Sequence, residues 1–428
     1  MFASHMILPD LRNQSIFDRL SPTLLSDLGL IHKGAAGRFS LLPLGTLIFE
    51  RMKKIHRRNM LAAGAIEATF LSLAPADTWR ESGRWDSFGP ALIKTKLHGD
   101  QAACLNPTHE EAAVTIMRDW LTSYRDLPKN LFCIQKVYRD EPRPKSQLLR
   151  THEFVMADSY SFHQDSSDAD TCYQKMQDVF STTFAAYGLP CQIIHADNGL
   201  IGGSRSVEFQ LPHELGESRF VACSCGYAAD VSVLRKEGIC NECGEEIEAI
   251  KGIELGHIFH LETTYSAKMS LRVRGQNNKM QHPVMGCTGI GMTRSLQSIV
   301  MSHLKESGVA WPKAVAPFDV VIQSDSNEKS QMIGIEANLA AKGVSVLADD
   351  RDVSKAAQNA LTDFTSPPIV LKQVGAHWDA VAKGNSVETG ISAEAVLPYV
   401  DAILLAGQKS QQKQTFAERL EPFDGAAE

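Results

Sequence analysis

The segment YRDEPRPKSQLLRTHEFVMADSYSF, residues 138–162, places four basic residues between two apolar runs. The runs LFCIQKVYR and LLRTHEFVMAD are typical of β-strands, and a polar loop with two prolines separates them. Side chains two positions apart on a strand share a face, so Arg139 lies with Glu141, and Arg150 lies with Phe154. If the strands pair as a hairpin, guanidinium groups and an aromatic ring converge on one surface.

Such a surface suits a nucleoside triphosphate. A guanidinium group binds phosphate oxygens through two parallel hydrogen bonds, and an aromatic face can stack on a purine. The alternative is a solvated hairpin with surface salt bridges, and this segment alone leaves both interpretations open.

Composition limits the class of protein. The 428 residues include 43 basic and 50 acidic side chains, and the net charge of −7 does not favour polyanion binding by bulk charge. Apolar residues at 43% and charged residues at 22% are typical of a globular chain with two or three domains. We expect no membrane span, because no run of 18 uncharged apolar residues occurs. Nine cysteines, an odd count, favour a reducing compartment over a secreted disulfide framework.

The pattern along the chain predicts two domains. Apolar spacing predicts helices over residues 46–59, 108–124 and 167–187, and strands over 67–75 and 191–197. After Asp319 the pattern alternates between strand and helix, which predicts a separate small α/β domain with a largely parallel sheet. The segment WPKAVAP interrupts the earlier pattern. We therefore expect one domain over residues 1–311 and a second, with the C-terminal tail, over residues 312–428.

Four cysteines form a candidate metal site. Cys223, Cys225, Cys240 and Cys243 are arranged as CxC, a gap of 14 residues, and CxxC. Two such pairs can bind zinc tetrahedrally. The alternative is a hairpin whose thiols simply pack, and the first pair is one residue tighter than the usual CxxC.

The hairpin segment resembles the second signature motif of class II aminoacyl-tRNA synthetases, specifically the prolyl branch. Six further blocks match that family in order, from about residue 28 to residue 375. They are PADTWRESGRWDSFG (75–89), LNPTHEEA (105–112), ADNGLIGGS (196–204), KGIELGHIFHL (251–261), MGCTGIGMTR (285–294) and GVAWPKAVAPFDV (308–320).

The resemblance implies an α+β fold in which helices flank an antiparallel catalytic sheet, followed by a small α/β anticodon-binding domain. Residues 1–311 would be the catalytic domain, with a four-cysteine linker at 223–243, and residues 312–428 the anticodon-binding domain. The family forms homodimers and activates L-proline with ATP. It then transfers the prolyl group from the adenylate to tRNA(Pro).

The resemblance also implies roles for the residues of the hairpin. Arg139 would hold the α-phosphate and the substrate carboxylate, and Arg150 would reach the outer phosphates. Glu141 would lie beside the adenine or the amino group, and Phe154 would stack on the adenine. Arg294, at the start of a helix after a glycine-rich strand, would press on the other face of the adenine and touch the γ-phosphate.

Further candidate residues follow from the same resemblance. Thr108 and Glu110 resemble the loop that accepts the two hydrogens of the proline ammonium, although a helix N-terminus with a threonine cap is the alternative interpretation. Magnesium should accompany ATP, and Glu208 is a candidate ligand. Arg351 and Lys355, in the segment that begins DDR, resemble the anticodon-reading loop.

Three positions depart from the family pattern. Val207 stands where histidine is usual near the proline pocket, Thr288 replaces a tyrosine, and Glu262 replaces a glycine at a turn. These changes put the pocket shape in doubt. The large editing insertion is also missing after Cys243, so we expect some activation of alanine, because one methylene is worth only about 1–3 kcal/mol of discrimination.

The chain is most similar to the mitochondrial type of this family, so we expect the mitochondrial matrix, with the bacterial cytoplasm as the alternative. A secretory signal is absent, and a mitochondrial presequence would have to be very short. Two rival functions stay open at this point. One is a synthetase-like paralogue that binds nucleotide or tRNA without charging it. The other is an enzyme that activates a different amino acid or loads a different carrier.

Overall fold

The computed structural model describes residues 1–11, 13–18, 21–324, 329–382 and 388–412. The chain divides into two compact units, one of Ser15–Leu304 and one of Met1–Gln14 with Lys305–Glu428. The sequence did not indicate that the first residues belong with the C-terminal unit. Among the described residues, no helix has both the length and the apolar character needed to cross a membrane.

The segment quoted first folds as an antiparallel hairpin. Strands β7 (Lys129–Tyr138) and β8 (Glu153–His163) pair from Lys129↔Phe162 to Tyr138↔Glu153. The second strand begins later than the run LLRTHEF suggested, because Gln147–Leu149 forms a short 3₁₀ turn before it. Both leucines of that turn are buried, and the backbone amide of Leu148 donates to the Gln297 side chain at 2.7 Å. The loop that joins the two strands of the hairpin is therefore tied into the interior.

A nine-stranded sheet surrounds this hairpin, in the order β10-β9-β12-β11-β13-β16-β8-β7-β3, and β10 also pairs with β13. The pairing is antiparallel except between β3 and β7 and between β12 and β9. The expected antiparallel sheet of an α+β fold is thus confirmed. The strands added here are β3 (Ile66–Glu67), β9 (Gln192–Ala196), β10 (Arg205–Pro212), β11 (Ser218–Ala222), β12 (Ala228–Asp230), β13 (Ala249–Glu262) and β16 (Val284–Gly291).

The register of this sheet assigns each side chain to one of two faces. Paired residues share a face, and successive residues alternate. One row, read from β10 to β7, consists of Glu208, His257, Gly289, Asp158 and Cys133. The adjacent row consists of Val207, Ile258, Thr288, Ser159 and Phe132. We call the two sides the Asp158 face and the Ser159 face.

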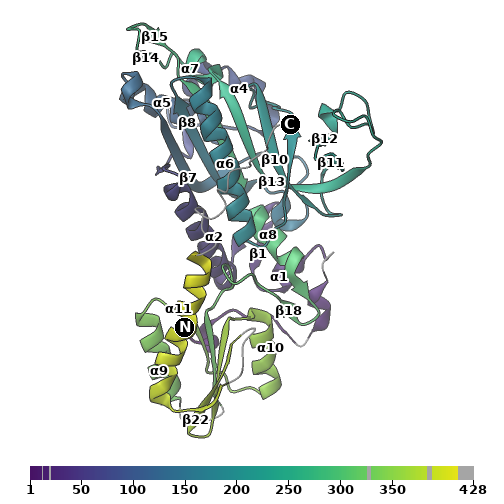
Figure 1. The fold of residues 1–428 in the computed structure, drawn as a ribbon, viewed down its shortest axis with the longest axis vertical. Helices are drawn as coiled ribbons and strands as arrows, with labels where there is room; N and C mark the ends of the chain where they lie inside the picture. Colours follow the sequence, from purple (N-terminus) through teal and green to yellow (C-terminus); the bar gives the residue numbers. More distant parts are fainter. Residues whose placement is uncertain (12, 19–20, 325–328, 383–387, 413–428) are drawn as a thin grey trace, which may run out of the picture. The chain divides into compact units, whose positions relative to one another are not determined.

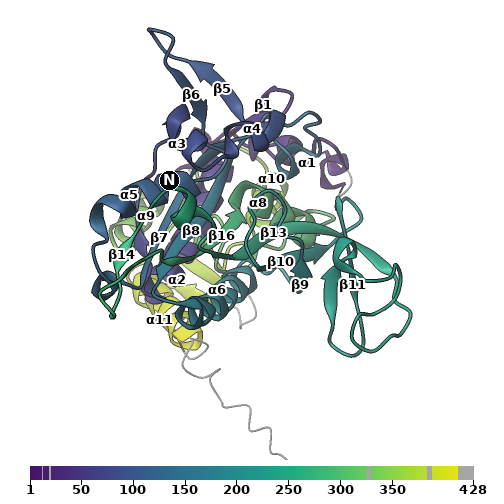
Figure 2. The same cartoon turned by 90° about the horizontal axis from the view of Figure 1, so that it is seen from above.

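Long helices cover the Ser159 face. Helices α2 (Pro43–Ala62) and α6 (Ser166–Ala186) lie on one side of the central strands, and α3 and α4 lie on the other (Figures 1 and 2). The Phe180 ring of α6 packs on Phe209, with centroids 5.5 Å apart, and His56 of α2 packs edge-on against Phe132. Both helices were expected from the sequence. Gly289 lets β16 lie close to β8 on the opposite side, since a Cβ there would be 3.2 Å from the Met156 sulfur.

Helices α5 (Glu110–Trp120) and α7 (Thr264–Lys268) cover one end of the Asp158 face. Val114 and Met117 of α5 form a core cluster with Tyr160 and Phe162 of β8. The expected strand over 67–75 is instead two short strands, β3 and β4 (Leu73–Pro75). The chain leaves the sheet after β3, because the Gln135 side chain binds the backbone of Phe70 from both its amide and its oxygen.

The smaller elements of this unit connect these layers. They are α1 (Leu24–Asp27), β1 (Ile31–Ala35), β2 (Arg38–Leu41), α3 (Ala76–Glu81), α4 (Arg84–Ser87), β5 (Ile93–Lys96), β6 (Ala102–Leu105), β14 (Val273–Arg274), β15 (Met280–Gln281) and α8 (Met292–His303). Two further short strands are β17 (Leu304–Lys305) and β18 (Gly308–Val309).

The C-terminal unit is a five-stranded sheet with helices. Three strands, β20 (Val346–Asp349), β19 (Val320–Gln323) and β21 (Ile369–Val374), run parallel, as the alternating pattern predicted. Strands β22 (His377–Ala382) and β23 (Glu388–Ile391) continue the sheet antiparallel, because the short turn after β21 can join only antiparallel neighbours. Its helices are α9 (Ser330–Ala341), α10 (Lys355–Thr365) and α11 (Ala393–Gln412).

Candidate active site

Arg139 lies directly after β7 on the Asp158 face. Its guanidinium carbon is 5.2 Å from the centre of the Phe154 ring, and Nη2 donates to the Pro107 carbonyl at 3.3 Å. Its Nε is buried and has no hydrogen-bond partner among the described residues. Burial lowers the pKa of Arg139, and the nearby charge of Arg294 acts in the same direction. A buried cation with an open donor is suited to binding an anion.

Arg150 is held by two carboxylates. Its Nε donates to Glu141 at 2.7 Å, and Nη1 donates to Glu217 at 3.1 Å. The Lys145 ammonium also lies 2.9 Å from Glu217. The hydrogen bond from Arg150 to Glu141 raises the pKa of Arg150. A phosphate group would therefore have to replace a carboxylate at Arg150, which is one-third exposed.

Arg294 occupies the first turn of α8, directly after the glycine-rich strand, as the sequence indicated. Its Nε donates to the Leu149 carbonyl at 3.0 Å, and its Nη1 donates to the Glu254 carbonyl at 2.6 Å. The same Nη1 is 3.7 Å from the Glu254 carboxylate. These bonds fix the guanidinium beside the hairpin turn at Leu149 and beside β13.

Two carboxylates and a histidine meet at this side of the sheet. His257 Nδ1 is 3.3 Å from Glu254 and 3.5 Å from Glu208, and Gln210 donates to Glu208 at 2.7 Å. Burial, together with the charge of Glu254, raises the pKa of Glu208 to about 7. Although burial opposes the charge of Glu254, His257, Arg294 and Arg139 lower the pKa of Glu254 to about 2.

A β-bulge brings Glu254 to this cluster. The register of β10 against β13 shifts between Phe209 and Gln210, so Phe209 pairs with Gly256 and Gln210 pairs with Glu254. Without the shift, simple alternation would place residues 254 and 257 on opposite faces. The sequence identified Glu208 but missed Glu254. The acidic residue in the block KGIELGH was the available signal.

Magnesium fits this carboxylate pair. Hard cations of this kind prefer carboxylate oxygens, and they usually bind with one or two carboxylates and the phosphates of the substrate.

Thr108 and Glu110 form a buried hydrogen-bonded pair. The Thr108 hydroxyl donates to the Glu110 carboxylate at 2.7 Å and lies 3.1 Å from the Tyr160 hydroxyl. Helix α5 begins at Glu110 with His109 as the N-cap, and no side chain caps it. The alternative interpretation of Thr108 as a helix cap is therefore wrong, because its hydroxyl is used by Glu110.

Arg84 is a site residue that the sequence interpretation missed. Its Nη1 donates to Glu110 at 3.0 Å and to both oxygens of Glu111 at 3.1 and 3.2 Å, although Arg84 is only 5% exposed. Burial opposes its charge, yet the charges of Glu110 and Glu111 raise the pKa of Arg84 well above its usual value. Three aromatic rings enclose the guanidinium carbon at 5.0–5.3 Å, those of Trp79, Phe88 and Tyr265.

A second buried network lies beneath Thr108. The Tyr160 hydroxyl donates to Asp158 at 2.5 Å and accepts from the backbone amide of His109 at 2.7 Å. His109 Nδ1 lies 2.8 Å from the Asp158 carboxylate, and the Cys133 thiol donates to the same carboxylate at 2.8 Å. This network fixes the loop before α5 to strands β7 and β8.

Two departures from the family pattern lie away from this site. Val207 and Thr288 belong to one row of the Ser159 face, and the Thr288 hydroxyl is 2.8 Å from the Ser159 hydroxyl. The side chains of Val207 and Thr288 therefore point toward the helix layer, on the face of the sheet opposite Glu208 and Asp158. Glu262 has φ +52°, a conformation that favours glycine, and its carboxylate accepts from Ser204 at 2.9 Å.

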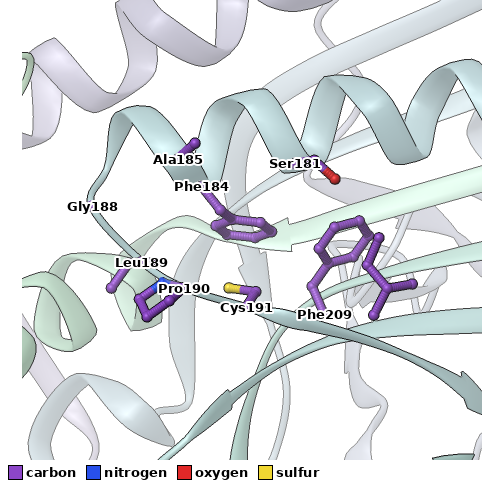
Figure 3. Close-up of a pocket in the computed structure, with 9 residues that line it drawn as sticks. Ser181, Phe184, Ala185, Gly188, Leu189, Pro190, Cys191 and Phe209 are labelled. Carbon is purple, nitrogen blue, oxygen red and sulfur yellow. The ribbon is translucent and has the colours of Figure 1, made fainter. Parts of the chain in front are cut away.

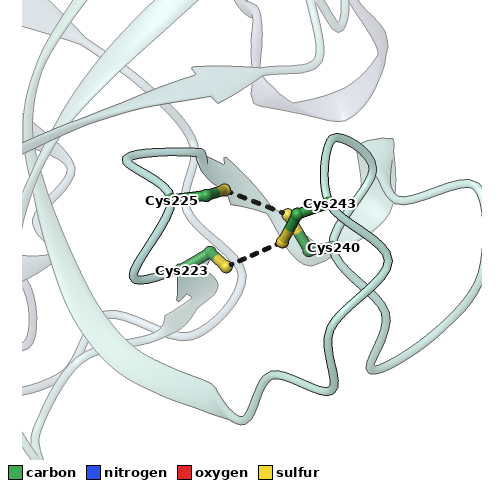
Figure 4. Close-up of side chains that lie close together, drawn as sticks. All are labelled: Cys223, Cys225, Cys240 and Cys243. Carbon is green, nitrogen blue, oxygen red and sulfur yellow. Dashed lines mark hydrogen bonds between the residues drawn. The ribbon is translucent and has the colours of Figure 1, made fainter.

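The remaining candidates lie outside this cluster. In the C-terminal unit, Arg351 donates to both carboxylate oxygens of Asp349 at 2.7 and 2.8 Å, and Lys355 begins α10. The four cysteines come together beyond β11, with all four sulfurs within 4.8 Å of one another (Figure 4).

A pocket of about 490 Å³ opens on the helix side of the sheet, where Phe184, Cys191 and Phe209 face one another (Figure 3). None of its nine lining residues carries a charge. A triphosphate needs cationic partners, so this pocket is distinct from the candidate active site.

Known proteins share this chain's sequence and fold. A family model described as the tRNA synthetase class II core domain (G, H, P, S and T) matches residues 94–303. A proline–tRNA ligase of Methylobacterium radiotolerans is 36% identical over 385 residues, which cover 82% of this chain and 86% of the relative. A proline–tRNA ligase of Agrobacterium fabrum is 35% identical over 406 residues, which cover 86% of this chain and 91% of the relative.

A solved structure shares the fold. The crystal structure of prolyl-tRNA synthetase from Cryptosporidium parvum, complexed with halofuginone and AMPPNP, superposes with a TM-score of 0.67 at 15% identity. The match covers 91% of this chain and 79% of that chain.

Replacing Arg84 with leucine should destabilise the unit of Ser15–Leu304 by about 3–5 kcal/mol, because two buried carboxylates would lose their cation. Arg84→Lys should recover only part of this loss, since a lysine cannot bind both carboxylates in the same geometry. Urea denaturation followed by circular dichroism measures the effect.

Arg80→Leu is the matched control, because Arg80 is 54% exposed, pairs with the exposed Asp77 and lies over the Trp85 ring. An Arg84→Leu protein as stable as the Arg80→Leu protein would contradict the assigned role of the buried ion pairs.

Proposed function

The chain belongs to the proline–tRNA ligase family, and on that premise we propose how its residues activate L-proline with ATP and charge tRNA(Pro). The observation that carries the proposal is the convergence of Arg139, Phe154, Arg294 and Glu254 on one side of the antiparallel sheet. This arrangement offers an aromatic surface, cations for phosphates and carboxylates for a metal ion, and no nucleophilic side chain is required.

In the first step, a carboxylate oxygen of proline attacks the α-phosphorus of ATP, and pyrophosphate leaves. Arg139 binds the α-phosphate and the proline carboxylate through guanidinium N–H groups that include Nε, which has no partner among the described residues. Both reactants are anions, so a shared guanidinium reduces their repulsion and aligns them. The product is prolyl-adenylate.

The other residues hold the nucleotide. Phe154 stacks on one face of the adenine and Arg294 lies on the other, while Arg294 and Arg150 bind the outer phosphates. When a phosphate replaces Glu141 as the partner of Arg150, the Glu141 carboxylate binds the adenine or the amino group. Supporting this arrangement, the hydrogen bond from Arg294 Nε to the Leu149 carbonyl ties α8 to the turn that precedes Arg150.

Thr108 and Glu110 select the amino acid. The Glu110 carboxylate and the Thr108 hydroxyl accept the two hydrogens of the secondary ammonium of proline. Arg84 holds the Glu110 carboxylate in place through a hydrogen bond at 3.0 Å, and is therefore a positioning residue rather than a catalytic one. In the second step, a terminal ribose hydroxyl of tRNA attacks the carbonyl of the adenylate, and AMP leaves.

Glu208 and Glu254 would hold magnesium, which neutralises phosphate charge when it is bound with ATP. The four-cysteine cluster does not suit this ion, because thiolates prefer zinc and other softer metals. In the C-terminal unit, Arg351 and Lys355 contact the anticodon. Since Asp349 already binds the guanidinium fork of Arg351, that contact requires either the exposed edge of Arg351 or a change of partner.

The mitochondrial matrix, with the bacterial cytoplasm as the alternative, stays a prediction. The relatives compared above are bacterial proteins, and they share 35–36% of their residues with this chain.

Proline should support ATP–pyrophosphate exchange by the purified chain, and alanine should support slower exchange, because the editing insertion is missing and a methylene is worth only about 1–3 kcal/mol. A panel of amino acids tests the proposal. Exchange with no amino acid would favour the non-charging paralogue, and exchange with an acid other than proline or alanine would favour an altered specificity.

Glu254→Gln should raise the magnesium concentration required for half-maximal exchange by about 10-fold or more, because one carboxylate ligand is lost. Glu262→Gln is the matched control on the same strand, since Glu262 is half-exposed and bonds Ser204. An unchanged magnesium requirement in the Glu254→Gln protein would rule out this ligand assignment.

We also propose a homodimer. Support comes from apolar side chains exposed in the last turn of α2 and after it. Leu61, Ile66, Leu71 and Leu73 are 51, 52, 62 and 41% exposed. Sedimentation equilibrium at micromolar concentration should give twice the chain mass of 47.0 kDa. A measured mass of 47.0 kDa under those conditions would contradict the proposed homodimer.

A further inference from the structure

We propose that Cys223, Cys225, Cys240 and Cys243 bind one Zn²⁺, and that this ion holds the part of the sheet that supplies Glu217 and Glu254 to the nucleotide site. The second half of this inference rests on the function proposed above. The first half depends only on the cysteine cluster.

The sulfur positions fit a tetrahedral zinc ion. The Cys223 and Cys243 sulfurs are 3.5 Å apart, and those of Cys225 and Cys240 are 3.6 Å apart (Figure 4). A zinc–sulfur bond of about 2.3 Å in a regular tetrahedron gives sulfurs about 3.8 Å apart. All four sulfurs lie within 4.8 Å of one another, so the ion fits with movements of a few tenths of an ångström.

The backbone supports metal binding at both cysteine pairs. In the first pair, the Cys223 amide donates to Tyr227 at 2.8 Å and the Gly226 amide donates to the Cys223 carbonyl at 3.0 Å. The second pair repeats the pattern, with Cys240 bonded to Glu245 at 2.9 Å and Gly244 bonded to Cys240 at 3.1 Å.

Both turns end in a glycine with positive φ, +92° at Gly226 and +77° at Gly244. Two similar turns thus face each other and present sulfur atoms between them, although their cysteine spacings differ.

The segment has little else to fix its structure. Among residues 231–250, all of which the structure describes, only Cys240 is buried. Asn241 supplies one polar link, because its side chain donates to the Tyr227 hydroxyl at 2.7 Å. A segment that buries so little apolar surface gains little folding free energy from packing. A bound metal would supply that free energy.

Paired disulfides are the main alternative chemistry. A disulfide requires sulfurs about 2.05 Å apart, whereas both sulfur pairs here are separated by more than 3.4 Å. Each sulfur also lies near the two cysteines outside its own pair. This four-way arrangement is the one that a shared ion explains.

The cluster is joined directly to the nucleotide site. Strand β11 ends at Ala222, one residue before the first cysteine, and pairs with β13 from Ser218↔Gly252 to Val221↔Ala249. Figure 2 shows the loops of this segment projecting from the sheet at β11. An ion that binds both pairs therefore fixes the end of β11 and the start of β13 relative to each other.

Both strands carry a residue of the nucleotide site. Glu217 directly precedes β11 and binds Arg150 and Lys145. Glu254 lies two residues beyond Gly252 on β13, next to Arg294. Loss of the ion should therefore loosen the contacts of the phosphate-binding arginines more than those of the distant Thr108 and Glu110.

The first experiment measures metal content by plasma mass spectrometry after purification without chelators. Wild-type protein should contain about one zinc per chain, and Cys225→Ser/Cys243→Ser protein should contain almost none. Cys191→Ser, which removes a half-buried cysteine outside the cluster, is the matched control and should keep its zinc. Cobalt-loaded wild-type protein should show the visible absorption of a tetrahedral thiolate site.

Wild-type protein with less than about one-tenth zinc per chain, or with the four cysteines oxidised in pairs, would overturn the metal site. This result does not depend on the variants being folded.

The second experiment separates binding from general damage. In exchange assays with excess magnesium, the zinc-free variant should have a KM for ATP raised severalfold, while the KM for proline changes little. Zinc loss with an unchanged KM for ATP, or an equal rise in both KM values, would overturn the link to the nucleotide site. Wild-type exchange with proline in the same assay tests the proposed function separately.

Discussion

Backbone pairing across strands β10, β13, β16, β8 and β7 is the constraint on which the rest of this structure depends. Because paired residues share a face, the register alone decides that Glu208, His257 and Asp158 lie on one side and Val207, Thr288 and Ser159 on the other. A slip of one residue would exchange the helix-packing row for the polar row. The bulge beside Gly256 then brings Glu254 to the same side as His257.

Three arginines of this site are paired with carboxylates of the protein itself. Arg84 lies between two buried glutamates, Arg150 between two partly exposed ones, and Arg294 beside Glu254. The buried set resists rearrangement, because separating it would leave uncompensated charges in a poorly solvated interior. The exposed pairs of Arg150 are weaker and can be exchanged. In the proposed mechanism, rigid recognition of the amino acid and adjustable recognition of phosphates therefore have different physical origins.

Several expectations from the sequence were local, and these were accurate. The helices α2 and α6, the two strands of the hairpin, and the helix that places Arg294 after a glycine-rich strand all follow from short-range patterns. The errors came from long-range effects. The strand expected over residues 67–75 is interrupted because Gln135 of β7 binds the Phe70 backbone. The sequence also did not indicate that Val207 and Thr288 face the helices, because only the strand register decides this.

The amino-acid sequence by itself determined the family, the antiparallel catalytic sheet, the alternating C-terminal unit and most of the charged residues of the site. Motif order and residue type carry that information, because arginine, glutamate and cysteine keep their chemistry in any fold. Only the tertiary structure decided which of these groups meet. The ion pairs of Arg84, the approach of Glu254 to Glu208 and the gathering of four sulfurs join segments that are far apart in sequence. Strand register, a bulge and side-chain burial set those distances, and no local pattern encodes them.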